Sequence, residues 1–217
     1  MNRKFFVPAA VAIAIALPGA AAAEVMASAT TDLNIRSGPG PQYPVIGVIN
    51  VGGQATIAGC MEGSQWCSVN HNGVDGWAYS AYLTSEVSGA PVVIAEHRSD
   101  IGLPVVTYEG SADATVTGAV GGALAGALIG GPVGAAVGGV AGAATGAMID
   151  PPAEVRTYVT SNQVDPVYLE GEVVVGAALP ETVELRPIPD YEYSYVYVNG
   201  QPVLVEPASR QIVYVVR

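Results

Sequence analysis

Two cysteines and two histidines are the residues of this chain best suited to nucleophilic or metal chemistry. Cys60 or Cys67 could supply a thiolate, and His71 or His97 could be the base that activates it. However, Cys67 lies in a predicted strand and His71 in a turn, Asn-His-Asn-Gly, so no helix-borne nucleophile faces a base. Six residues separate the cysteines, which does not match usual zinc spacing. We therefore predict no catalytic residue, no metal site and no cofactor.

The start of the chain predicts export. Met-Asn-Arg-Lys precedes an uncharged run over 5–23 that ends in three alanines, the pattern of a secretory signal peptide over 1–23. A retained membrane anchor is the alternative, which prolines at 8 and 18 disfavour. Export to the periplasm or cell envelope would place Cys60 and Cys67 in an oxidising compartment, where a disulfide is their simplest state.

The mature chain is acidic and rich in turn-forming residues. After cleavage, six arginines face nineteen acidic residues, a net charge of −13, and such a surface repels nucleic acid. With 27 glycines and 16 prolines, one continuous core is disfavoured. Composition instead predicts three separate structural units, the first two joined by a linker over 87–113.

The sequence of the first unit, residues 25–86, predicts a small β-barrel. Short apolar runs are separated by Gly, Pro, Asn and Ser, and the candidate strands are 27–31, 45–51, 54–61, 66–70 and 76–79. Two stretches resemble the bacterial SH3 (SH3b) family, in the order in which that family has them. They are Leu33-Asn-Ile-Arg-Ser-Gly-Pro-Gly40, and the segment that contains Gly76, Trp77 and Leu83.

The resemblance implies binding of peptidoglycan or a peptide in the cleft beside the looped segment 33–47. Aromatic faces suit such apolar and sugar contacts, so the expected lining residues are Tyr43, Trp66, Tyr79 and Tyr82. Arg36 is interpreted as a structural arginine of the loop. A cell-wall peptide or an envelope protein is the expected partner.

A glycine repeat marks the second unit, residues 114–149. Glycine recurs at every fourth position, at Gly118, Gly122, Gly126, Gly130, Gly134, Gly138, Gly142 and Gly146. On a helix this repeat forms a groove for close helix packing, a glycine zipper. Pro132 interrupts it, which predicts a helical hairpin with arms of roughly 25 Å. Membrane association and homo-oligomers are the expectation, and a soluble zipper or a flexible spacer is the alternative.

The third unit, residues 150–217, is predicted to be β-rich. Apolar runs occur at 172–175, 183–185, 191–198, 202–205 and 211–216, and Asn199-Gly200 predicts a hairpin turn. Tyrosines at 191, 193, 195 and 197 alternate along one strand face, where they either pack on a core or bind a partner. The segment resembles DUF1236, a domain of unknown function found in exported bacterial proteins.

The predicted fold class is mainly β: an SH3-like barrel, a Gly/Ala-rich helical hairpin and a small β-rich domain. The favoured function is a non-enzymatic envelope binding or scaffolding protein whose zipper mediates membrane association or oligomerisation. A zipper oligomer that forms a pore or stabilises the envelope is one alternative. A soluble periplasmic stress or adhesion protein is another.

Overall fold

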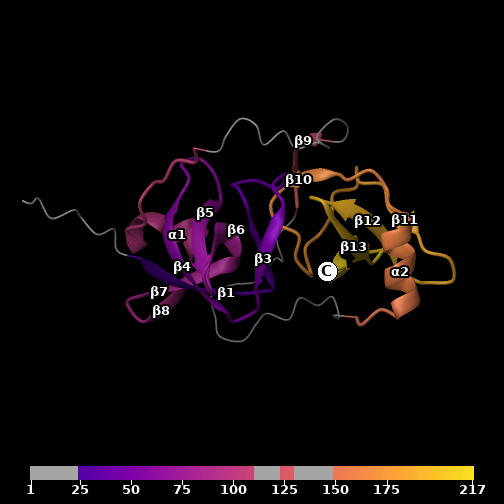
Figure 1. The fold of residues 1–217 in the computed structure, drawn as a ribbon, viewed down its shortest axis with the longest axis horizontal. Coiled ribbons are helices and arrows are strands. Elements are labelled where there is room, and N and C mark those ends of the chain that lie inside the picture. The colour runs from indigo at the N-terminus through magenta and orange to yellow at the C-terminus, as the bar shows by residue number, and fades with distance from the viewer. Residues whose placement is uncertain (1–23, 110–122, 130–148) are drawn as a thin grey trace, which may run out of the picture.

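The computed structural model describes residues 24–109, 123–129 and 149–217. Two groups of strands dominate this part of the chain and lie side by side, one coloured indigo to magenta and the other orange to yellow (Figure 1). The described α-helices are α1 (Ile94–Ile101) and α2 (Ala153–Ser161). The prediction of a mainly β protein is confirmed.

The first group is an antiparallel sheet of eight strands in the order β3-β2-β6-β5-β4-β1-β7-β8. Each of the five strands predicted in this unit is found, shifted by at most two residues. The bounds are β1 (Val25–Ala29), β2 (Leu33–Arg36), β3 (Val45–Ile49), β4 (Gln54–Cys60), β5 (Trp66–His71), β6 (Val74–Tyr79), β7 (Leu83–Val87) and β8 (Ala90–Val93). A short 3-10 helix, η1 (Ser80–Tyr82), connects β6 to β7.

The segment predicted as a linker contributes regular structure to the barrel. It supplies β8 and α1, and the chain after α1 returns to β4, where Cys60 N–H donates to Pro104 O at 3.0 Å and accepts at its carbonyl from Val106 N at 3.0 Å. Only glycine fits at Gly59, because a Cβ there would lie 2.5 Å from Val106 Cγ1 and 2.6 Å from Pro104 O. The barrel unit therefore extends to at least residue 106.

The second group is a four-stranded sheet in the order β11-β12-β13-β14. Its strands are β11 (Arg186–Pro187), β12 (Ser194–Val198), β13 (Gln201–Val205) and β14 (Ile212–Val215). Asn199 and Gly200 both have positive φ, 50° and 78°, and join β12 to β13, so the predicted hairpin turn is confirmed.

The C-terminal sheet buries a different core on each face, as the alternation of side chains along a strand requires. On one face, tyrosine rings, Leu204 and Val213 pack against α2 through Val155 and Val159. The hydroxyls of Tyr195 and Tyr197 donate to carbonyls of Asn162 and Val159, at 2.8 and 3.1 Å. The tyrosine face thus covers a core, which was one of the two alternatives.

The opposite face of that sheet shares its core with the barrel. Val196, Val198 and Val203 belong to the same buried cluster as Leu33 and Ile35 of β2. Segments between α2 and β11 join this cluster through Leu169, Val173 and Val174. The barrel and the C-terminal unit, expected to be separate, form one packed body.

A buried ion pair fixes the contact between the two units. Leu33 and Ile35 of β2 point into the barrel core, so Asn34 and Arg36 point to the other face, yet these polar residues are only 0% and 1% exposed. Arg36 Nε and Nη2 donate to the two carboxylate oxygens of Glu172, each at 2.6 Å. Asn34 Nδ2 donates to the same carboxylate at 3.1 Å.

Arg36 also shapes the loop that follows β2. Its Nη1 donates to the carbonyls of Pro41 and Tyr43 at 2.9 and 2.8 Å, and to Asn199 O at 3.3 Å. These bonds agree with the interpretation of Arg36 as a structural arginine of the loop. They also add a function that the sequence did not indicate, because the same side chain docks the C-terminal unit.

The glycine repeat falls almost wholly outside the described residues. The exception is Gly126, in β9 (Ala123–Leu128), which pairs in parallel with β10 (Tyr168–Glu170). The helix expected at 123–128 was therefore wrong: glycine is a poor helix former, and β10 offers a backbone edge to pair with. Gly118, Gly122, Gly130, Gly134, Gly138, Gly142 and Gly146 lie outside the description. Across 24–109, 123–129 and 149–217, no helix combines the length and apolar character needed to span a bilayer.

The predicted disulfide is present. Cys60 of β4 and Cys67 of β5 are paired neighbours in the sheet, with Cα atoms 3.9 Å apart, and their sulfurs are bonded. The bridge closes the hairpin whose tip spans 61–65, between these two strands.

Removing the disulfide should destabilise the protein. In the Cys60→Ala/Cys67→Ala variant we expect the free energy of unfolding to fall by roughly 2.5 kcal/mol, because the unfolded chain regains the entropy of the loop. Urea denaturation of the mature protein measures this, and wild-type protein under reducing conditions should give a comparable loss. An unchanged midpoint in both experiments would contradict the expectation.

Breaking the buried ion pair should cost more than breaking an exposed one. Arg36→Ala leaves the Glu172 carboxylate buried without its cation, so we expect a loss of about 3–5 kcal/mol in the free energy of unfolding. The control is Arg186→Ala, because Arg186 and Glu184 pair at the surface, with side chains 51% and 73% exposed; it should change stability by less than about 1 kcal/mol. Equal urea midpoints for the two variants would show that Arg36 does not hold the units together.

Candidate functional site

The structure divides the four predicted lining residues between two aromatic clusters. Tyr43 meets Tyr108 edge to face, with ring centroids 5.6 Å apart, and Tyr108 meets Trp77 in the same way at 5.5 Å. Trp66, Tyr79 and Tyr82 form the other cluster, with centroids 5.4 Å apart between Trp66 and Tyr79 and 6.1 Å between Tyr79 and Tyr82.

Exposure separates these rings further. Trp66 and Tyr82 are only 1% and 3% exposed and therefore serve as packing beneath the surface. Tyr79 and Tyr43 are partly exposed. Tyr79 is thus the predicted lining residue of the second cluster that a ligand can reach, and the buried rings of Trp66 and Tyr82 hold it in place.

Tyr79 lines a pocket of about 520 Å³ that is largely open to solvent. The walls come from the β4–β5 tip, from β6, from α1 and from β10 of the C-terminal unit; the lining residues are Gly63, Ser64, Gln65, Tyr79, Ala95, Arg98 and Glu170. Its polar and aromatic groups make it the candidate binding site.

Another hollow, of about 500 Å³, lies along β1 and β7. Its lining includes one charged side chain, Glu86, and no aromatic ring. It therefore offers fewer groups that could orient a ligand, and the pocket beside Tyr79 is the better candidate.

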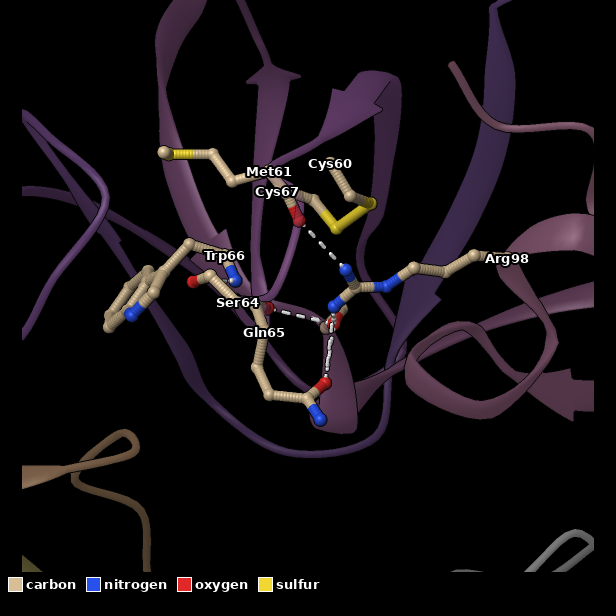
Figure 2. Close-up of a disulfide and its surroundings, with 8 residues drawn as sticks. Cys60, Met61, Ser64, Gln65, Trp66, Cys67 and Arg98 are labelled. Carbon is tan, nitrogen blue, oxygen red and sulfur yellow. Dashed lines mark hydrogen bonds between the residues drawn. A yellow bond between two sulfur atoms is a disulfide. The ribbon is translucent and has the colours of Figure 1, made fainter. Parts of the chain in front are cut away.

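The disulfide and Arg98 together order the tip that forms one wall of the pocket (Figure 2). Arg98 Nη1 donates to Met61 O at 3.1 Å, and Nη2 donates to Gln65 Oε1 at 3.2 Å and Ser80 Oγ at 3.0 Å. Ser80 in turn donates from its hydroxyl to Gln65 O at 2.8 Å. The tip is therefore tied to η1 and α1 by side chains as well as by the bridge.

The charges around the pocket act on Tyr79. Burial raises the pKa of the Tyr79 phenol, the carboxylates of Glu170 and Glu172 raise it further, and Arg98 acts in the opposite direction. Burial lowers the pKa of Arg98, against the influence of Tyr79, but an arginine remains charged near neutrality. At neutral pH the pocket therefore presents a guanidinium, a neutral phenol that can donate a hydrogen bond, and a carboxylate.

Sequence reasoning did not find Gln65, Arg98 or Glu170. Arg98 lies in the segment interpreted as a linker, and Glu170 lies 91 positions after Tyr79 in another unit. No local spacing links such residues. The tyrosines were found because aromatic side chains in a barrel stand out in a sequence.

The cysteines and histidines form no catalytic group in the described residues. Both sulfurs belong to the disulfide. His71 Nδ1 lies 2.7 Å from Gln54 O, and His97 Nδ1 lies 2.9 Å from an Asp100 carboxylate oxygen. No group of three or more His, Cys, Asp or Glu side chains in the described part of the chain is placed to hold a metal ion.

Comparison with known proteins identifies both units. Residues 31–84 match the bacterial SH3 domain family, and residues 158–217 match the domain of unknown function DUF1236. A curated relative from Bacillus subtilis (strain 168), named Putative N-acetylmuramoyl-L-alanine amidase YrvJ, is 33% identical over 79 residues, which is 36% of this chain and 15% of the relative. This chain thus spans a small part of that relative's length. No solved structure matches the chain significantly. The protein therefore carries a bacterial SH3 domain, which forms the barrel, and a C-terminal DUF1236 domain, which packs against it.

Proposed function

We propose that this chain is an exported, non-catalytic binding protein of the cell envelope whose SH3 barrel binds cell-wall peptide. The observation that carries the proposal is the pocket beside Tyr79, in a barrel of the bacterial SH3 family. A segment of this chain is similar to a relative named Putative N-acetylmuramoyl-L-alanine amidase, which supports a cell-wall ligand for the barrel.

The groups in the pocket suit a peptide attached to sugar. The partly exposed ring of Tyr79 offers an apolar face, and Gln65 and Arg98 offer hydrogen-bond donors to carbonyl or carboxylate oxygens. Binding without chemistry fits these residues, because the pocket lining includes no cysteine, histidine or candidate pair of nucleophile and base.

Export to the periplasm is the second part of the proposal. It rests on the signal-peptide pattern over 1–23 and is supported by the disulfide between Cys60 and Cys67, since such bonds persist in oxidising compartments. The acidic mature surface agrees with a partner other than nucleic acid.

Membrane association or self-association through the glycine repeat is a third and separate part. The repeat continues from Gly130 to Gly146 without a charged residue, a composition compatible with close packing between helices in a membrane. The barrel can bind a ligand without membrane association and without self-association. The three parts of the proposal can therefore be tested independently.

Binding should be measured by co-sedimentation of the mature protein with purified peptidoglycan sacculi. We expect the wild type to pellet with sacculi, and Tyr79→Ala to bind roughly five- to tenfold more weakly, because an aromatic contact contributes about 1 kcal/mol. Tyr193→Ala, a partly exposed tyrosine on the α2 face of the other domain, is the control and should bind like the wild type. If the wild type stays in the supernatant, or if both variants bind equally, the pocket is not the cell-wall site.

Alkaline carbonate washing of membranes tests the role of the repeat. Inserted protein should stay in the membrane pellet, whereas peripheral protein should be released, since the wash removes proteins held by polar contacts alone. Gly138→Leu should weaken retention because its side chain blocks close helix approach. Complete release of the wild type would remove membrane insertion from the proposal and leave the binding function intact.

A further inference from the structure

The pocket beside Tyr79 is built by both domains, and its two charges come from opposite sides. Arg98 belongs to α1 of the barrel unit, and Glu170 belongs to β10 at the start of the DUF1236 domain. Within the lining, Gly63, Ser64, Gln65 and Tyr79 lie in the SH3 match, Glu170 lies in the DUF1236 match, and Ala95 and Arg98 lie between the two.

The positive charge of Arg98 has no acidic partner among the described residues. Its hydrogen-bond acceptors, Met61 O, Gln65 Oε1 and Ser80 Oγ, are all neutral, and it takes part in no ion pair within the described part of the chain. Its Nε is buried without a hydrogen-bond partner. The guanidinium is therefore held in place by neutral groups. Because Nε is buried and Nη2 already donates twice, the second N–H of Nη1 is the donor left for an anionic ligand.

The Glu170 carboxylate is likewise available, while its backbone is fixed. The side chain is exposed and makes no hydrogen bond or ion pair to another described residue. Its carbonyl accepts from Ile129 N at 2.9 Å, and two residues later Glu172 is locked to Arg36. A carboxylate on such an ordered segment can meet a cation at a defined position.

Tyr79 lies in the field of both groups. Tyr79, Arg98 and Glu170 line the same pocket, so both charges lie near the ring. A ligand lying over Tyr79 therefore has a guanidinium within reach on the barrel side and a carboxylate within reach on the DUF1236 side.

We propose that the DUF1236 domain completes the barrel's pocket and that the ligand is a zwitterionic peptide, with its carboxylate on Arg98 and its ammonium group on Glu170. The inference rests on the proposed function, since it specifies the chemistry of the same pocket. In this protein the DUF1236 domain then has a function, because it supplies the part of the site that binds the amine. The Arg36–Glu172 pair holds that part in register with the barrel.

Three probe peptides separate the two charges of the ligand: trialanine with both ends free, N-acetyl-trialanine and trialanine amide. Each is titrated into isotope-labelled mature protein, and the dissociation constant is read from the backbone amide signals of the 63–65 tip. We expect free trialanine to bind at least tenfold more tightly than either blocked peptide.

Glu170→Gln tests the contribution of DUF1236. This exposed substitution should retain the wild-type urea midpoint, should remove the preference for the free amine, and should keep the preference for the free carboxylate. Glu181→Gln, another exposed carboxylate of the domain, is the matched control and should keep both preferences. The proposal is overturned if the wild type binds no probe, or if Glu170→Gln discriminates among the probes as the wild type does.

Sacculus binding distinguishes this inference from the broader function. If the wild type and Glu170→Gln pellet equally with sacculi and show the same peptide preferences, the composite pocket is wrong and cell-wall binding stands. If the wild type prefers free trialanine but does not pellet with sacculi, the composite pocket stands and the cell-wall function falls.

Discussion

The buried pair between Arg36 and Glu172 is the interaction on which the arrangement of this protein depends. Removing two charges from water costs several kcal/mol for each ion, so such a pair is tolerated only where the remaining donors and acceptors are satisfied. Here most of them are: Arg36 also donates to carbonyls of Pro41, Tyr43 and Asn199, and Glu172 also accepts from Asn34 and from Val173 N, while Asn34 Oδ1 is buried without a hydrogen-bond partner among the described residues. Arg36 and Asn34 belong to the barrel, and Glu172 belongs to the DUF1236 domain. The network therefore specifies how the two domains are placed relative to each other.

In that placement, each domain covers a face of the other. In the barrel, β2 is buried on both faces, because the DUF1236 domain covers the side that would otherwise face water. In the DUF1236 domain, one face of the sheet is covered by its own helix α2, and the other contributes to the cluster shared with the barrel. The two domains therefore share buried surface, and the candidate pocket opens at their boundary.

Features encoded by neighbouring residues were predictable from the sequence, and features that depend on distant residues were not. The short strands, the Asn199-Gly200 turn and the disulfide follow from local patterns of turn residues, β-branched residues and cysteine spacing. The partner of Arg36 is 136 positions away, and an alternating strand containing Asn34 and Arg36 predicts a solvated face. The repeat of Gly126 indicated a helix because its spacing fits one face, but period alone does not reveal an adjacent strand edge such as β10.

The distance in sequence between Arg36 and Glu172 also sets an order of folding. The barrel residues precede the DUF1236 residues in the chain and are the first available to fold, but a contact over 136 positions must await the intervening chain. Until β10 and the residues around it dock, the face of β2 that carries Asn34 and Arg36 is exposed to solvent, and Arg36 lacks its partner Glu172. During folding there is therefore an interval in which the barrel strands have paired but the DUF1236 domain has not yet docked. A chaperone or a wrong contact would affect the docking of the two domains most during that interval.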